Sequence, residues 1–307
     1  MKIKVIVNPR SKNGDNKYLK MMLKEKFGQY LVDIEQTAYP RHATEIAQRA
    51  VKENVDTIVA VGGDGTVNEV LNSIVGTEVA LGIIPTGTAN DLASLCHIPK
   101  DLPQACEVIF ERHLHCADVI CVNGWYYVTA GGLGLPCEVV SIANTIKRQG
   151  TIGKLLRQIL GSKVYILAVL CALFKKARRR TLLNIRCNGS SLVVDSLSLM
   201  VNNQPFLGKN FLMSPAAIND DGMFDICLIE NFKRRMQILS ILIKVITGRH
   251  IYSPSVKTWR AKELIVNAEE PLSFIGDGEI IQQGTQFSIQ IIPRALRLLT
   301  PIQKGSL

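Results

Sequence analysis

Three short loops of glycine, hydroxyl, amide and acidic residues each follow an apolar run in the first third of the sequence, at 8–12, 62–66 and 85–91. Glycines allow a backbone to approach a ligand closely, and the start of a helix favours a bound phosphate. A carboxylate in such a loop repels phosphate unless a cation lies between the two groups. Asp64 therefore indicates Mg²⁺ bridging nucleotide oxygens. Asp64 could instead cap a helix, and the loop alone leaves this alternative open.

The segments around these loops alternate between strand and helix patterns. Because ligands of a parallel sheet gather at the carboxyl ends of its strands, we expect the three loops to lie side by side. The alternation predicts an open, mostly parallel sheet with helices on both faces. Strands are expected at 2–7, 31–36, 57–61 and 79–84, and helices at 17–27, 41–54, 67–75 and 91–96.

A different pattern begins near residue 118, which we take as the boundary between a nucleotide-binding α/β domain, 1–118, and a β-rich domain, 119–307. Turn signals such as Asn123-Gly124 and Asn188-Gly189 separate short strand patterns there. The second domain is therefore predicted to be an antiparallel β-sandwich with added helices. The last segment of the chain could instead pack on the first domain. A helix is expected over 138–176, and strands over 181–187, 192–201, 224–230, 256–268, 272–275 and 286–293.

Composition narrows the classes of partner. The 307 residues carry a formal net charge of +10, which favours a polyanionic partner. Aromatic residues make up only 6% of the chain, which disfavours base stacking, so no nucleic-acid partner is expected. The eight cysteines form no Cys-x-x-Cys pair and are expected to be reduced thiols in a cytoplasmic protein.

Two apolar stretches, 164–174 and 237–247, are shorter than the roughly 20 residues that a membrane-spanning helix needs. We expect core or interfacial helices at both. A basic run, 175–180, directly follows the first stretch, and a second run, 233–235, precedes the other. These cations could complement a helix end and face solvent, or they could dock the protein on an anionic membrane surface.

The three loops also carry a resemblance. The segments NPRSKNG, VGGDGTVNEV and PTGTANDLA are similar to the catalytic domain of the diacylglycerol kinase family, above all to its small soluble bacterial lipid kinases. The resemblance covers nearly the whole chain and implies a first domain like that of NAD kinases and phosphofructokinases. Because those enzymes also carry GGDGT, the loop PxGTxND is the more discriminating piece. The sequence departs from the common form at Thr86 and Ala89, neither of which supplies a side chain that the implied chemistry needs.

The resemblance implies roles for individual residues. Asp64 would serve a catalytic Mg²⁺, and Asp91 and Asp118 would organise water around it. The residues implied to bind ATP are Asn8, Pro9, Arg10, Ser11, Lys12, Thr37, Gly62, Gly63, Asp64, Gly65, Thr66, Val67, Asn68, Glu69, Gly87, Thr88 and Asn90.

Two acidic turns in the second domain complete the implied site. Asp221 would give a carboxylate to a structural Mg²⁺, and Ile218 and Met223 would give backbone carbonyls, although a plain Asp-Gly turn is the alternative. Asp277 and Glu279 are both candidates for the general base that takes the proton from a lipid hydroxyl as it attacks the γ-phosphorus. The sequence leaves the choice between these two open.

The main hypothesis is an ATP-dependent lipid kinase, with diacylglycerol as the favoured acceptor and phosphatidic acid as its product. Such an enzyme would be cytoplasmic and would contact anionic membrane surfaces peripherally. The alternatives are a kinase with a polar substrate such as NAD, and a non-catalytic lipid-binding regulator. The identity of the lipid, the choice of ATP over another nucleotide and the oligomeric state, including a homodimer, stay open.

Overall fold

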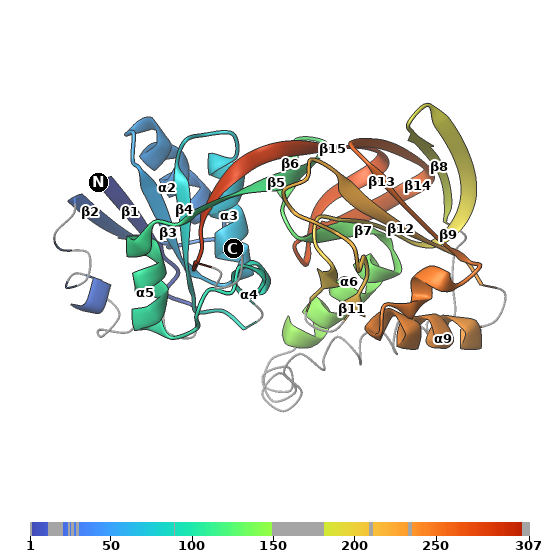
Figure 1. Cartoon of the computed structure of the whole chain (residues 1–307), viewed down its shortest axis with the longest axis horizontal. Helices are drawn as coiled ribbons and strands as arrows, with labels where there is room; N and C mark the ends of the chain where they lie inside the picture. The colour runs from blue at the N-terminus through green and yellow to red at the C-terminus, as the bar shows by residue number, and fades with distance from the viewer. Residues whose placement is uncertain are drawn as a thin grey trace. The chain divides into compact units, whose positions relative to one another are not determined.

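The chain divides into two compact units, each described here by itself (Figure 1). Unit 1 consists of Met1–Val119 and Ile292–Leu307, and unit 2 of Ile120–Ile291. Two strands, β5 (Leu114–Val122) and β15 (Glu279–Leu299), contribute residues to both units. The computed structural model describes residues 2–11, 21–23, 25, 28, 31–88, 90–148, 181–208, 211–232 and 235–302.

Unit 1 is built on the predicted parallel sheet. The strands lie in the order β15-β4-β3-β1-β2, with β1 (Lys2–Val7), β2 (Leu31–Gln36), β3 (Thr57–Gly62) and β4 (Ala80–Pro85). The strand ends are in register, because Val7 pairs with both Gln36 and Val61, and Gly62 pairs with Pro85. The loops that follow these strands therefore begin at one edge of the sheet.

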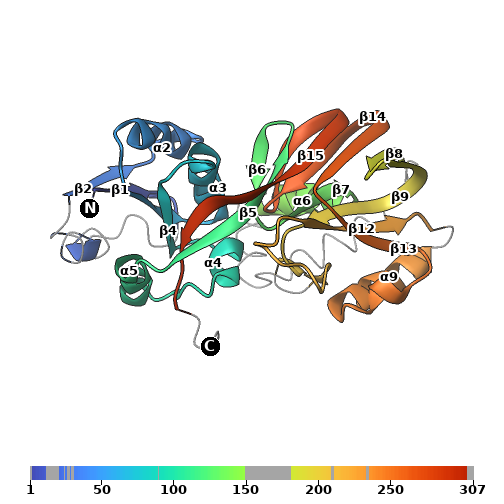
Figure 2. The same ribbon diagram turned by 45° about the horizontal axis from the view of Figure 1, so that its top comes forward.

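The helices of unit 1 are α2 (His42–Lys52), α3 (Asp64–Ile74), α4 (Asp91–Leu95) and α5 (Leu102–Glu111). Figure 2 shows α2 and α3 on one side of the sheet and α5 on the other. The inner face of α2 buries Ala43, Ile46, Ala47 and Ala50, as its periodicity predicts. The third helix begins at Asp64 and not at 67, because the glycine-rich loop itself supplies its first turn. Most of the helix expected at 17–27 lies outside the described residues.

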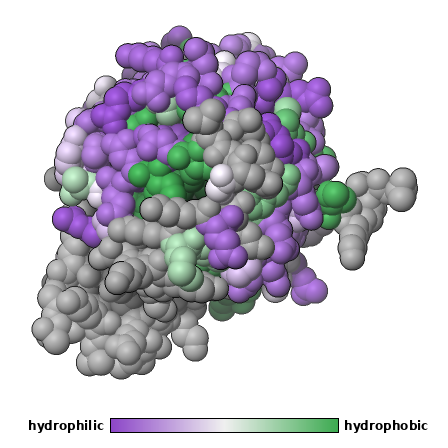
Figure 3. Space-filling model, turned by 90° about the vertical axis from the view of Figure 1, so that its left-hand side faces the viewer, coloured by the Kyte–Doolittle hydropathy of each residue, from purple (hydrophilic) through white to green (hydrophobic). Residues whose placement is uncertain are grey.

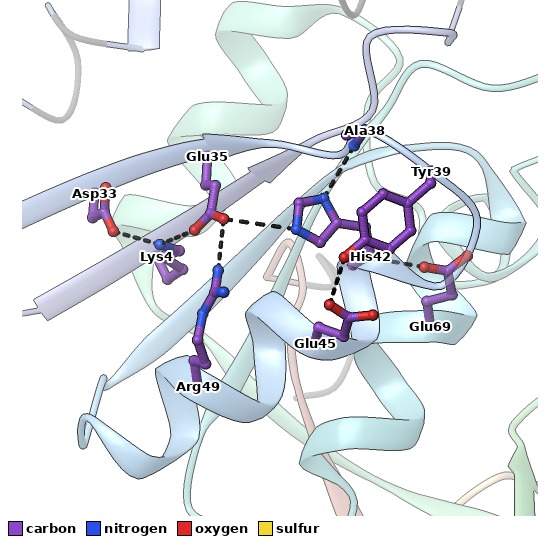
Figure 4. A network of polar contacts seen from close by, with 10 residues as sticks. Lys4, Asp33, Glu35, Ala38, Tyr39, His42, Glu45, Arg49 and Glu69 are labelled. Carbon is purple, nitrogen blue, oxygen red and sulfur yellow. Dashed lines mark hydrogen bonds and ion pairs between the residues drawn. The ribbon is translucent and has the colours of Figure 1, made fainter.

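A charged network fixes the edge strand β2 to β1 and α2 (Figure 4). Lys4, although buried, donates hydrogen bonds to Asp33 and to Glu35, the latter at 2.7 Å, and Arg49 donates to Glu35 at 2.6 Å. Burial opposes the charge of Lys4, but these two hydrogen bonds outweigh it and raise the lysine pKa. Among the coloured atoms of the face seen from the side of β2, most are hydrophilic, and a group of hydrophobic residues lies near the centre (Figure 3).

Unit 2 is an antiparallel sandwich, as predicted. Its main order is β13-β12-β9-β7-β14-β15, while β8 pairs with both β9 and β14, and β6 pairs with β5. The turns at Asn123-Gly124 and Asn188-Gly189 adopt positive φ at both residues, which matches the favoured two-residue hairpin. The strands are β6 (Trp125–Tyr127), β7 (Ala130–Gly134), β8 (Leu182–Cys187), β9 (Ser190–Asn202), β10 (Phe206–Leu207), β11 (Phe211–Leu212), β12 (Phe224–Glu230), β13 (Val256–Ala261) and β14 (Glu263–Gly276).

Two cores lie on opposite faces of the β9–β12 pair, because alternate residues of a strand point to opposite faces. Leu199 and Ile226 belong to the core shared with β14 and β15. Met200 and Cys227 belong to a second core, which α6 (Leu135–Arg148) and α9 (Arg235–Ile246) cover. Within the described ranges, no helix is long and apolar enough to span a bilayer. The apolar stretch 164–174 and the basic run 175–180 lie outside those ranges.

Three predicted strands in unit 2 have the wrong limits. The strand expected over 286–293 is the middle of β15, which runs from Glu279 to Leu299. The strand expected over 256–268 is divided at Lys262, where the chain leaves its pairing with β12 and begins to pair with β15. The strand expected at 272–275 is the end of β14, which continues past Pro271 through an irregular register between Asn267 and Leu272. A bulge accommodates a proline that would otherwise interrupt the ladder.

Candidate active site

Side-chain hydrogen bonds join the three loops at the edge of the parallel sheet in unit 1. Asn8, after β1, donates its amide Nδ2 to Thr66 Oγ1 at 3.0 Å. Thr86, after β4, donates its hydroxyl to Ser11 Oγ at 2.8 Å. The loop 8–11 therefore touches both of the others, as the expected arrangement requires. Thr86, which the resemblance marked as a departure, has this structural role.

Asp64 fastens the second loop to the third. Its Oδ2 accepts the backbone N–H of Asn90 at 2.8 Å, and its Oδ1 accepts that of Asp91 at 2.6 Å. The backbones also meet, since a Cβ built on Gly87 would lie 2.4 Å from the Cα of Gly63. Both glycines are thus needed for close approach and leave backbone, without side chains, at the centre of the loop pair.

This arrangement suits a phosphate and its cation. The first N–H groups of a helix have no partner within the helix, and α3 begins at Asp64 directly beside the contact with Gly87. Asp64 uses one bond on each oxygen and keeps lone pairs on both, and Asp91 is the next acidic side chain in the cluster. Among the described residues, no three His, Cys, Asp or Glu side chains form a metal site. A Mg²⁺ here would take most ligands from nucleotide and water, as it commonly does.

Asp118 has a different setting. It is fully buried, and its Oδ1 accepts the backbone N–H of Arg294 at 2.8 Å, within unit 1. The carboxylate thus helps hold the residues of β15 that return to this unit. Its predicted place in a magnesium site stays a prediction.

Glu69 was expected to contact nucleotide phosphates, but its carboxylate binds the start of α2. Oε1 accepts the N–H of Arg41 at 3.1 Å and Oε2 that of Ala43 at 3.1 Å (Figure 4). Arg41 has φ 68°, a left-handed conformation that is costly for a residue other than glycine, and the two hydrogen bonds offset that cost. Glu69 therefore positions the loop that contains Thr37, and its predicted contact with phosphate stays a prediction.

The remaining predicted nucleotide contacts differ in accessibility. Val67 is buried and its N–H donates to the carbonyl of Gly63, and its predicted nucleotide contact stays a prediction. Arg10 and Thr88 are exposed, and Thr37 follows β2 at the loop edge. Lys12 lies outside the described residues. Pro9, Gly62, Gly65 and Asn68 lie within the loops or the first turns that follow them.

In unit 2, Asp277 is held by three donors. The N–H of Thr129 and its hydroxyl donate to Oδ1 at 2.8 and 2.6 Å, and the N–H of Val128 lies 3.2 Å from both carboxylate oxygens. Asp277 has φ 50°, which Asp tolerates better than most residues. The carboxylate thereby fastens the 277–278 turn to the segment between β6 and β7. Sequence reasoning missed Thr129, which follows no recognisable motif.

Glu279 is the first residue of β15 and is exposed. It lies directly across the two-residue turn from Gly276, with which it pairs. Of the two candidate bases in this turn, Asp277 has its Oδ1 engaged by donors and Glu279 presents its carboxylate at the surface. Glu279 is therefore the more exposed of the two residues, and which of them acts as general base stays a prediction.

The acidic turn at 218–223 does not have the form expected for a cation site. Arg260 donates to Asp221 Oδ2, and the N–H of Met223 donates to Asp221 Oδ1 at 3.1 Å. The guanidinium also lies 3.7 Å from Asp225. A Mg²⁺ on Asp221 would have to displace this arginine, so the present arrangement does not fit a metal, and Ile218 is an exposed turn residue.

Two family models match the chain. The diacylglycerol kinase catalytic domain matches residues 2–122, and the YegS C-terminal NAD kinase beta sandwich-like domain matches residues 148–300. The first match contains all three loops of unit 1. The second contains Asp277 and Glu279.

Curated relatives and a solved structure are similar over nearly the same extent. A diacylglycerol kinase of Bacillus subtilis (strain 168) is 27% identical over 282 residues, which cover 90% of this chain and 89% of that protein. A diacylglycerol kinase of Staphylococcus aureus (strain JH9) is 28% identical over 293 residues, covering 90% and 85%. A crystal structure of a diacylglycerol kinase from Bacillus anthracis strain Sterne has a TM-score of 0.76 at 22% identity, covering 98% and 97% of the two chains. At that identity the structural likeness shows the fold.

Proposed function

Because the chain belongs to the diacylglycerol kinase catalytic-domain family, we propose that it transfers the γ-phosphate of ATP to the hydroxyl of a lipid, with diacylglycerol as the favoured acceptor. The product would then be phosphatidic acid. The named activity of the relatives supports this choice of acceptor, at 27–28% identity.

The observation that carries the proposal is the bonding of Asp64 to the backbone of Asn90 and Asp91. It joins two glycine loops that follow neighbouring strands, and it places the Asp64 carboxylate between the two loops. A lone helix-capping aspartate would need only one loop. A paired arrangement of this kind suits the oxygens of a polyphosphate and the cation that accompanies them.

We assign the proton transfer to Glu279. The hydroxyl oxygen of the lipid attacks the γ-phosphorus, the bond from that phosphorus to the bridging oxygen of ADP breaks, and the hydroxyl proton passes to the Glu279 carboxylate. Asp277 keeps the turn in place through Val128 and Thr129. A Mg²⁺ held near Asp64 and Asp91 would neutralise charge on the phosphates when bound.

A transfer assay tests the proposal. The protein is mixed with Mg²⁺ and ATP labelled at its γ-phosphate, and the acceptors are diacylglycerol, monoacylglycerol and a sphingoid base in mixed micelles, with NAD in plain buffer. We expect label on diacylglycerol above all, and little transfer by Asp64→Asn. Label on another lipid would replace the acceptor, label on NAD alone would overturn the lipid assignment, and no label on any acceptor would overturn the kinase assignment.

A further inference from the structure

Large apolar side chains are exposed on the helix α9, which Figures 1 and 2 label, and on the short 3₁₀ helix η2 (Arg249–Tyr252) that follows it in unit 2. The inner face of α9 packs Ile238, Ile241 and Val245 into the second core. Outside it, Ile243 is 60% exposed and Ile246 is 54% exposed, and Tyr252 at the end of η2 is 82% exposed. Single exposed hydrophobic residues are common, but three within ten residues of chain mark a contact surface.

The same segment is basic and contains no acid. Between 235 and 255 the sequence has three lysine or arginine residues and neither aspartate nor glutamate. Lys244 and Arg249 are exposed. Lys244 Nζ donates to Ser253 Oγ at 3.3 Å, so this cation is tied to the residue that follows Tyr252. Apolar and tyrosine side chains flanked by cations are typical of elements that lie in the interface of an anionic bilayer.

We propose that Ile243, Lys244, Ile246, Arg249 and Tyr252, the α9 surface, dock this protein on an anionic lipid bilayer. The inference rests on the proposed function in one respect, since a lipid kinase has to meet its acceptor at a membrane. The isoleucines would enter the acyl boundary and the cations would pair with headgroup phosphates.

Charge decides against a second copy of this chain as the occupant. A two-fold interface brings the same patch of both subunits together. Lys244 and Arg249 would then lie against a patch that also carries two cations, with no acidic residue of this segment to neutralise them. An anionic bilayer, in contrast, complements both cations and accepts the apolar side chains.

Sedimentation with vesicles tests the surface without any catalysis. The full chain is mixed with vesicles of equal parts phosphatidylglycerol and phosphatidylcholine, and with vesicles of phosphatidylcholine alone. We expect binding to the anionic vesicles that weakens with salt. Lys244→Gln/Arg249→Gln should lower the partition coefficient about 25-fold, since each cation near the surface contributes about fivefold. Ile243→Ser/Ile246→Ser should lower it at least tenfold.

The β8–β9 hairpin supplies matched controls. Val193 is 64% exposed and Arg186 is also exposed, so Val193→Ser and Arg186→Gln make the same chemical changes elsewhere on unit 2. Both controls should bind like the wild type. Equal binding by the α9 variants and the wild type would overturn the proposal, as would a change of oligomeric state in the α9 variants with vesicle binding intact.

A second readout separates docking from chemistry. Phosphorylation of a short-chain diacylglycerol that is monomeric in solution should be unchanged in the α9 variants, while phosphorylation of long-chain diacylglycerol in anionic vesicles falls. Loss of both activities with normal vesicle binding would overturn the docking role. If the wild type transfers phosphate to no lipid, the proposed function fails, but the sedimentation result still decides whether α9 binds a membrane.

Discussion

Asp277→Asn and Glu279→Gln, made separately, should separate a structural role of the first carboxylate from a catalytic role of the second. Asp277→Asn keeps the shape of the side chain and its tolerance of positive φ, but removes the charge that three donors from Val128 and Thr129 now share. A hydrogen bond to a charged group contributes about 1 kcal/mol more than a neutral one. Allowing for partial exposure, we expect the free energy of unfolding to fall by about 2 kcal/mol.

That loss converts to a melting temperature lower by about 4–8 °C for a unit of this size. Glu279→Gln should leave the melting temperature within about 1 °C, because the side chain is exposed. It should lower the rate of phosphoryl transfer about 10²- to 10⁴-fold, since the group that accepts the proton is lost. Asp277→Asn should keep more activity than Glu279→Gln when assayed well below its melting temperature.

The assay pairs thermal melting with transfer of labelled phosphate to diacylglycerol in mixed micelles. Glu269→Gln, an exposed change on β14, is the control and should alter neither quantity. The reasoning is refuted if Glu279→Gln retains transfer within tenfold of the wild type. It is equally refuted if Asp277→Asn melts normally and has lost transfer, because Asp277 would then be the base.

Three further outcomes follow from contacts in unit 1 and from one buried histidine. Glu69→Gln should raise KM for ATP about tenfold and leave KM for the lipid unchanged, because one amide group cannot accept both N–H bonds. Glu107→Gln, an exposed change on α5, serves as the control, and an equal rise in both KM values would contradict a positioning role. Gly87→Ala should abolish ATP binding in calorimetric titration while the chain stays folded, since its Cβ would meet Gly63, and normal binding would show that the loops can part. Burial lowers the pKa of His250 below its usual 6.5. As the pH falls, His250 therefore takes up a proton in the unfolded chain at a higher pH than in the folded chain. The free energy of unfolding should therefore fall as pH drops below about 6.5, and His250→Asn should flatten this decline in denaturant titrations; an unchanged slope would assign it to other groups.

Local patterns predicted those parts of the fold that depend on local chemistry. The hairpin at Asn123-Gly124 follows from two residues that accept positive φ, and the sheet of unit 1 follows from buried strands alternating with helices. The continuation of β14 past Pro271 could not be predicted, because it depends on a bulge and on pairing with β15, far along the chain.

In the candidate site, too, features that depend on local sequence were predicted and features that depend on distant segments were not. The loops at Asp64 and Asn90 were predicted from their composition, and the structure brings them together. The role of Glu69 depends on N–H groups at Arg41 and Ala43, more than twenty positions away, and nothing in the sequence indicates that partnership. Contacts between distant segments thus give this carboxylate a structural role that the motif alone does not indicate.

The return of β15 to unit 1 has a consequence for folding during synthesis. The segment 292–299 pairs with β4 through Arg297 and Leu298, yet the ribosome makes it only after the whole of unit 2. Until then β4 is an open edge, with unpaired backbone groups that can recruit another chain. A nascent or truncated 1–119 fragment should therefore be prone to aggregate. Of the strands of unit 1, β4 would be the one that stays exposed until the end of synthesis.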